Sequence, residues 1–284
     1  GTLDGAHMPV RMSVVPNLVA RPQLESAIAT TSISFNVSRF VGPALAGFII
    51  ASYGVATAFV VNGISYLALI AAMLVVQLNP APERKRRERH VWHEMREGIA
   101  YVLSHPSIRA LLVIVAVASL FGRGALEMLP AFADAVYQRG SAALAILTSA
   151  IGAGAIASGL VLSRGVHWLN VRVIRAAVIV AGILIAILGV LDDFWIAVGI
   201  VAALGVILSM GGVGSQILIQ TMVDDDVRGR VSSLWGVIAF GGTALGSLLI
   251  GWPASVWGLQ NVVVVAGVVC SVAAALSAFH ASSR

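Results

Sequence analysis

Charge and cysteine are what this 284-residue chain has least of. Charged residues make up 11% of the sequence and hydrophobic residues 58%, whereas a soluble domain carries roughly a quarter charged residues. The mean hydropathy is +0.94. A chain with so little charge is not an ordinary soluble domain, and its composition predicts an integral membrane protein.

The chain also lacks the residue groups that catalysis and metal binding require. Its sole cysteine is Cys270, so no disulfide forms within the chain. The six histidines are scattered, without the spacing of a metal site, and no phosphate-binding glycine loop of the Walker type is present. We therefore expect no enzyme activity, no catalytic residue, no metal, no cofactor and no use of ATP by this polypeptide.

The sequence contains several long apolar runs. A bilayer core about 30 Å thick needs about 20 apolar residues per helix, and the runs lack the alternation of a membrane β-strand, so helices are expected. Eight complete transmembrane helices are predicted, with part of a ninth from Gly1 to about Arg11. The eight runs are at about 24–52, 56–77, 108–131, 141–162, 170–190, 194–222, 229–252 and 259–280.

The first sixty residues reappear in the last sixty, 204 positions later. Gly42 falls on Gly246, and the pair Tyr53-Gly54 falls on Trp257-Gly258. Parallel repeats of this kind are typical of the two halves of a membrane transporter. The spans from 108 to about 204 have no earlier counterparts, so we expect about a hundred N-terminal residues to be missing from an all-α bundle of twelve spans.

Three parts follow from this organisation. Residues 1–77 are the remainder of the N-terminal six-helix half, with the end of helix 4 and helices 5 and 6. Residues 78–107 form a polar linker, in which apolar residues at helical spacing predict an amphipathic helix on the membrane surface. Residues 108–284 form the C-terminal half, helices 7–12. The segment Ser104-His105-Pro106 is expected to break the helix before the next span.

The distribution of arginine and lysine along the chain predicts how the protein is oriented in the membrane. The linker holds the cluster Arg84–Arg89, and the alternate connections near 192 and 257 hold no Lys or Arg. By the positive-inside rule the linker and the C-terminus are cytoplasmic, in a multi-pass protein of the cell membrane whose partner is the lipid bilayer. The net charge of +5 therefore reflects topology, and nucleic-acid binding is not expected.

Four stretches carry a resemblance to a known family by their order and spacing. They are Pro16-Asn17-Leu18-Val19, Gly42-Pro43-Ala44-Leu45-Ala46-Gly47, Arg96-Glu97-Gly98-Ile99-Ala100-Tyr101 and Val227-Arg228-Gly229-Arg230. They resemble the major facilitator superfamily, in the branch of transmembrane secretion effectors that includes enterobactin-exporter and macrolide-efflux types. The resemblance covers essentially the whole chain and implies two six-helix halves and transport of a small molecule.

The Gly-Pro stretch is similar to the antiporter motif of drug/proton exchangers. Its residues are Ser38, Gly42, Pro43, Ala46 and Gly47, and Ser38 and Ala46 stand where that motif has glycine. Small residues on one helix face allow close helix contact, and the proline bends the helix. The motif either supports antiport or makes a helix contact with no bearing on transport direction.

Two further stretches of small residues are expected to pack against neighbouring helices. They surround Gly154 and cover Gly242–Gly246. The stretch at Gly154 resembles a dinucleotide fingerprint only superficially, because no strand precedes it.

Ionisable residues inside spans are costly and are functional candidates by default. Asp4 and Arg39 are expected near mid-membrane on neighbouring helices, whereas Arg123 and Glu127 are expected in the outer half of one helix at i, i+4 spacing. Each pair is either a static ion pair or contains the carboxylate that couples proton movement to transport. Uncharged candidates for a central cavity are Asn36, Gln216 and Gln220.

Acidic and basic residues also gather at the cytoplasmic start of a later span. They are Asp224, Asp225, Arg228 and Arg230. Aspartates there cap the helix, or the group forms a cytoplasmic gate that is made and broken during transport.

The sequence as a whole predicts a secondary active transporter. It exports a small amphipathic or hydrophobic molecule, drug- or siderophore-like, by alternating access, with protons as the counter-substrate and a monomer as the working unit. The alternatives are an importer or uniporter of the same fold, or a membrane scaffold or receptor that transports nothing.

Overall fold

The computed structural model describes residues 45, 49, 53, 56–75 and 91–277. The chain divides into two compact units, residues 1–88 and 89–284.

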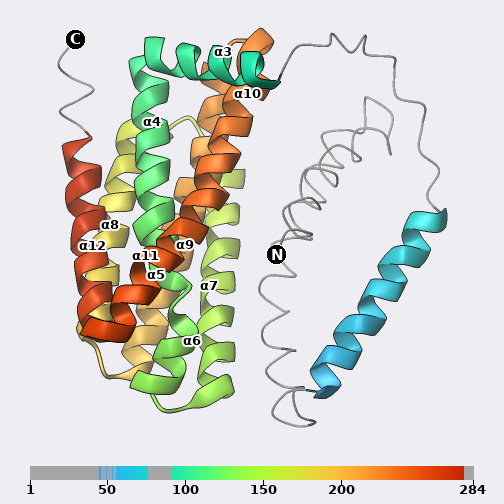
Figure 1. Ribbon diagram of the computed structural model, residues 1–284, viewed down its shortest axis with the longest axis vertical. Helices are drawn as coiled ribbons and strands as arrows, with labels where there is room; N and C mark the ends of the chain where they lie inside the picture. Colours follow the sequence, from blue (N-terminus) through green and yellow to red (C-terminus); the bar gives the residue numbers. More distant parts are fainter. Residues whose placement is uncertain (1–44, 46–48, 50–52, 54–55, 76–90, 278–284) are drawn as a thin grey trace. The chain divides into compact units, whose positions relative to one another are not determined.

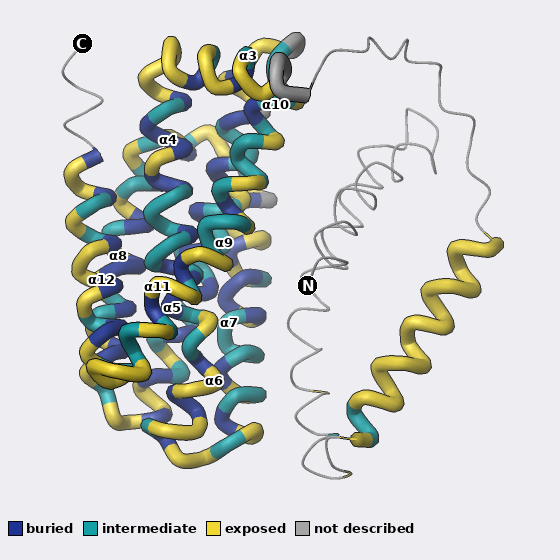
Figure 2. Tube along the Cα trace, viewed as in Figure 1, coloured by how far each residue is buried: buried dark blue, intermediate teal, exposed yellow. Residues whose placement is uncertain are grey.

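In the first unit the structure describes a helix at Ala56–Val75, 20 residues with a mean hydropathy of 2.2. Its length and composition suit a bilayer span, which confirms the predicted run at 56–77. Its apolar side chains are exposed along the helix (Figure 2), and Leu74 is 82% exposed. The predicted run at 24–52 and the antiporter-like motif lie outside the described residues, apart from Leu45 and Ile49.

The second unit is an all-α bundle (Figure 1). Among the described residues of the whole chain, seven helices are long and apolar enough to cross a membrane, and six of them belong to this bundle. Four of the six are single helices or nearly so: α7 Gly140–Ser163, α8 Val171–Val190, α9 Phe194–Met222 and α12 Leu259–Leu276. A shorter helix, α3 Val91–Ser104, lies across one end of the bundle.

The other two spans are interrupted by π-helical turns. The first, Pro106–Val136, is built from α4 Pro106–Val117, η2 Ala118–Arg123, α5 Gly124–Leu126, α6 Leu129–Ala131 and η3 Phe132–Val136. The second is built from α10 Asp225–Gly236, η4 Val237–Gly241 and α11 Gly242–Trp257. A π turn widens the helix by one residue, and such turns are frequent at functional sites.

The first composite span is longer than the sequence predicts. The apolar run ends at 131, whereas the helical path continues to Val136. Pro130 does not stop it, because a proline in the first turn of α6 gives up no hydrogen bond that the helix would make. The predicted end at 131 is therefore wrong by five residues.

Glycines allow the helix backbones to approach closely. A Cβ built on Gly154 of α7 would meet the backbone of Val206 and Gly205 on α9 at 2.7 and 2.9 Å. On α11, Gly246 faces the backbone of Leu120 in η2. Both predicted small-residue faces are confirmed as helix contacts.

The predicted aromatic-glycine turn at 257–258 is also confirmed. α11 ends at Trp257 and α12 begins at Leu259. Gly258 between them has φ 87° and ψ 139°, a conformation that residues with a Cβ rarely adopt. The chain reverses here in one residue, so the two helices are antiparallel neighbours.

Residues 104–106 separate α3 from α4, as the sequence predicts. α3 ends at Ser104, and α4 begins at Pro106 after the extended residue His105. α3 packs mainly on α10, and Gly98 and Val102 are its buried residues among those whose side chains are described. The helix is therefore part of the second unit, and its place on a membrane surface stays a prediction.

Candidate functional site

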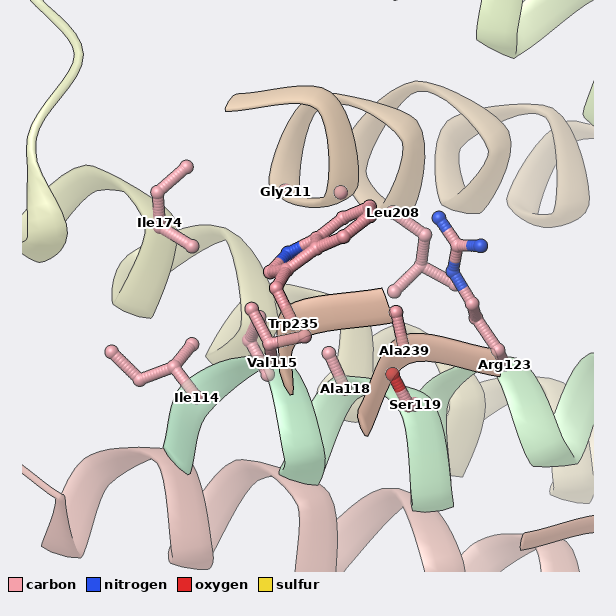
Figure 3. A pocket seen from close by; sticks show the side chains of 12 residues that line it. Ile114, Val115, Ala118, Ser119, Arg123, Ile174, Leu208, Gly211, Trp235 and Ala239 are labelled. Atoms are coloured by element: carbon pink, nitrogen blue, oxygen red, sulfur yellow. The ribbon is translucent and has the colours of Figure 1, made fainter. Parts of the chain in front are cut away.

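A small cavity lies inside the bundle between four spans (Figure 3). Its lining comes from α4 and η2, α8, α9, and α10 with η4. The space open to the centre of a water molecule is about 20 Å³, which holds about one water molecule. The lining includes apolar Ile114, Leu208 and Ala239, with Ser119, Arg123 and Trp235 as its side chains with polar atoms.

Arg123 is the last residue of η2 and is half-buried. It lies seventeen residues after Pro106 and thirteen before Val136, so it is near the middle of its span. Its guanidinium rests against α9 at Gly212, where a built Cβ would be 2.5 Å from Nη2. The absence of a side chain at Gly212 is therefore what lets the guanidinium reach this position.

Trp235 reaches the cavity from α10. Its indole Nε1–H donates to Ser215 Oγ at 2.9 Å, and Ser215 Oγ donates to the carbonyl of Gly212 at 2.8 Å. Figure 3 shows the side chains of Trp235 and Arg123 both extending toward the helix that carries Leu208 and Gly211. Ser215 is fully buried, so this chain of hydrogen bonds fixes the indole N–H against a buried part of α9.

Two π segments face each other across this cavity. Ala118, Ser119 and Arg123 belong to η2, and Ala239 belongs to η4. A π turn rotates the side chains that follow it around the helix axis. After each of these segments, the side chains therefore point in directions that differ from those in a regular α-helix. The cavity is thus lined by two of the three π segments of the composite spans, η2 and η4.

A second group of polar contacts joins α3 to α10. Arg230 Nη1 lies 2.8 Å from Glu97 Oε2, with side chains 22% and 33% exposed. Gly98 lies beneath this pair, since its built Cβ would be 3.2 Å from the Cβ of Arg230. The glycine allows α3 to lie close enough for the ion pair to form.

Tyr101 and Asp224 add a two-way contact at the same end. The Tyr101 hydroxyl donates to Asp224 Oδ2 at 3.0 Å and accepts from the Asp224 backbone N–H at 3.3 Å. Asp224 holds the N-cap position of α10, but its side chain makes no capping hydrogen bond. The predicted capping by Asp224 is wrong, because the carboxylate turns toward α3 instead. Arg228 donates to the carbonyl of Val223 at 3.2 Å.

The structure places some of the predicted site residues and not others. Arg123 lies at the cavity, Gln216 is half-buried on α9, and Glu127 is exposed one turn beyond Arg123. Gln220 and Asp225 lie in α9 and α10, and their side chains are outside the described set. Asp4, Asn36, Ser38, Arg39, Gly42, Pro43, Ala46 and Gly47 lie outside the described residues. The pairing of Arg123 with Glu127, and the roles of all these residues, stay predictions.

Four residues of these two sites were missed by the sequence reasoning as functional candidates. Trp235 and Ser215 carry no charge, and a search restricted to charged and amide side chains overlooks them. Glu97 and Tyr101 stand in the linker helix, where nothing in the sequence indicates that their partners lie on α10. An aromatic side chain with a polar atom inside a span is a usable signal, and Trp235 fits it.

Comparison with known proteins agrees with this architecture. At 25% identity the chain is similar to the staphyloferrin A transporter of Staphylococcus aureus, over 94% of this chain and 67% of that protein. It is also 25% identical to an enterobactin exporter of Salmonella typhi, over 84% of this chain and 57% of that protein. The chain thus spans little more than half the length of that exporter.

A solved structure has the same fold. It is a bacterial homologue of the human lysosomal transporter Spinster, with a TM-score of 0.65 and 15% identity, over 95% of this chain and 73% of that one. The sequence pattern of the transmembrane secretion effectors matches residues 4–282. The chain is therefore a multi-pass membrane protein that belongs to the transmembrane secretion effector family of major facilitator transporters.

Proposed function

We propose that the protein exports a small amphipathic or hydrophobic molecule, drug- or siderophore-like, by alternating access and in exchange for protons. The relatives named above are a staphyloferrin A transporter and an enterobactin exporter, which supports a siderophore-like substrate. One half of the complete protein would rock against the other around a midplane site. A monomer is the working unit.

The observation that carries the proposal is the cavity at Arg123. A charged side chain near the middle of a span is expensive, and such residues mark substrate and ion pathways in membrane proteins. Here the charge comes with a hydrogen-bonded tryptophan and two π segments. A scaffold that transports nothing gains no benefit from this combination.

Proton coupling needs a carboxylate whose pKa changes as access alternates. Desolvation raises the pKa of such a group, and a nearby arginine lowers it. The predicted pairs Asp4–Arg39 and Glu127–Arg123 would each supply these two conditions. We rank Asp4 first, because it is expected to lie deeper and to have its partner on another helix.

The contacts between α3 and α10 are the proposed gate. Glu97–Arg230 and Tyr101–Asp224 lie at one end of the bundle, which the positive-inside rule makes cytoplasmic. Cysteines placed at Arg86 and Asp225 should then be labelled only from the cytoplasm, and one at Asp192 only from outside. Labelling of Asp225 and Asp192 from the same side contradicts this topology.

Transport into inverted membrane vesicles tests the proposed function. The full-length protein is assayed against a panel of drugs and siderophores, with and without an imposed pH gradient, acid inside. We expect uptake that rises with the gradient and is abolished by a protonophore. Uptake only in right-side-out vesicles indicates an importer, gradient-independent equilibration indicates a uniporter, and no movement of any compound favours a scaffold.

A further inference from the structure

We propose that the cavity at Arg123 binds the anionic head group of an amphipathic substrate whose planar apolar part lies against Trp235. This inference rests on the proposed function, because it treats the cavity as part of the transport site. It narrows the substrate class to amphipathic anions with a carboxylate, phosphate or sulfonate group and disfavours lipophilic cations.

The cavity lining carries a positive charge at Arg123. Of the twelve described residues that line the cavity, Arg123 is the one with a formal charge, and most of the others are aliphatic or glycine. Attraction between opposite charges is several times stronger in such surroundings than in water. A guanidinium also presents a planar fork of N–H donors that matches two oxygens of one anion.

The guanidinium of Arg123 is held at the cavity by its contact with α9. Arg123 reaches across to α9 at Gly212, so its guanidinium lies beside the space lined by Leu208 and Gly211. Any side chain at Gly212 would displace it, since even a Cβ there would be 2.5 Å from Nη2. The glycine therefore keeps the cation inside the cavity.

Trp235 supplies an apolar surface in the same cavity. Its one polar atom is already used, because Nε1–H donates to Ser215, and what it offers a ligand is the apolar surface of the indole. Aromatic rings favour offset or edge contacts with other planar groups. The two sides of the cavity thus suit one molecule with a charged end and a planar apolar end.

The volume of the cavity sets a further condition. The space of about 20 Å³ holds about one water molecule, so the head group and the planar apolar part can bind beside Arg123 and Trp235 only when the flanking helices separate. Opening and closing at η2 and η4 would then control release of the head group.

A matched pair of fluorescent probes tests this inference. Anilinonaphthalene sulfonate and phenylnaphthylamine share one aromatic skeleton, and only the first carries an anionic group. Binding of each is measured by energy transfer from tryptophan to the full-length protein in nanodiscs, with empty nanodiscs as background. We expect the sulfonate to bind at least tenfold more tightly than the uncharged probe.

Variants then assign the anion preference to Arg123. Arg123→Gln should weaken sulfonate binding about ten- to a hundredfold, the usual range for a lost charge-assisted hydrogen bond, and change phenylnaphthylamine binding less than about twofold. Arg123→Lys should lie between, because it keeps the charge and loses the fork. Arg175→Gln is the control, since Arg175 is not among the residues that line the cavity and is bonded to Ser277, and it should change neither probe.

Equal weakening of both probes by Arg123→Gln, in protein that stays monodisperse, would show a structural role for Arg123 and overturn the inference. A wild-type protein that prefers the uncharged probe would overturn it as well. Binding needs no gradient, so failure of vesicle transport with this pattern intact would refute the exporter proposal and leave the anion site standing.

Discussion

Glu97 on α3 and Arg230 on α10 form an ion pair of 2.8 Å that joins the linker helix to a membrane span. Because both side chains are partly exposed, the pair contributes little to stability, about 0.5 kcal/mol. Its effect on transport should be larger if the gate must break and re-form. We expect Glu97→Arg to slow efflux several-fold and the double exchange Glu97→Arg with Arg230→Glu to restore most of it.

Tyr101→Phe is the companion variant for the gate. It removes the hydroxyl that donates to Asp224 and keeps the ring that stacks on His105 at 4.0 Å. We expect faster opening and a modest change in efflux. If the charge exchange fails to rescue efflux and Tyr101→Phe changes nothing, the α3–α10 contact is a passive attachment.

The close contact of α7 and α9 predicts a difference between two glycines on one helix. A Cβ at Gly205 would lie 2.9 Å from the Cα of Ile151, whereas nothing lies within 4 Å of one at Gly199. Gly205→Ala should destabilise the fold by about 1–3 kcal/mol, the usual cost of overpacking. Gly199→Ala should be neutral or slightly stabilising. Unfolding in detergent micelles with increasing dodecyl sulfate measures both, and equal stability of the two variants would refute the contact.

Tyr137 predicts a pH dependence at the end of the bundle opposite α3. Burial, with smaller contributions from the charges of Asp192 and Asp193, raises the pKa of Tyr137 to about 12. The unfolded pKa is near 10, so the folded state holds this proton more tightly. Its contribution to the free energy of unfolding is therefore intact below about pH 10 and is lost as the pH rises toward 12.

Comparison of the wild type with Tyr137→Phe isolates the titration of the Tyr137 hydroxyl. The absorbance of tyrosinate in the wild type minus that in the variant should titrate near pH 12. The hydroxyl is buried without a hydrogen-bond partner among the described residues, so the variant should be as stable as the wild type at pH 7, or slightly more stable. Titration of this difference near pH 10 would show that Tyr137 is open to solvent.

The proton-coupling hypothesis predicts different outcomes at two carboxylates. Asp4→Asn should uncouple efflux from the pH gradient and leave substrate binding intact, because the neutral side chain neither takes up nor releases a proton. Glu127→Gln should do so only if the pair with Arg123 is the coupling site instead. Vesicle uptake with and without the gradient compares them, and unchanged pH-driven uptake in both variants would remove this assignment.

The fold was largely predictable because its signals are local. A run of about twenty apolar residues is visible as such at 170–190 and 259–280, and both are helices close to these limits. Gly258 was predictable for the same reason, since an aromatic-glycine step between two apolar runs indicates a turn. Gly154 and Gly246 followed from small residues inside helices.

The sites were less predictable because they depend on pairs far apart in the sequence. Tyr101 and Asp224 are 123 residues apart, and neither residue type indicates its partner. The π turns at 118–123 and 237–241 add one residue to a turn without changing the composition, so they leave little trace in the apolar pattern. Arg123 was predictable as a site residue because a charged residue inside an apolar run is conspicuous. Trp235 carries no charge, and it was not predicted as a site residue.

Labelling of one cysteine in the cavity tests alternating access most directly. Ala239 lines the cavity from η4 and is 5% exposed, and Ala239→Cys is placed in a Cys270→Ala background of the full-length protein. The account predicts that an impermeant maleimide reaches this cysteine from either side of the membrane, and that an exported compound changes the two rates in opposite directions. A cysteine that reacts from one side only, at a rate that the compound does not change, would contradict it.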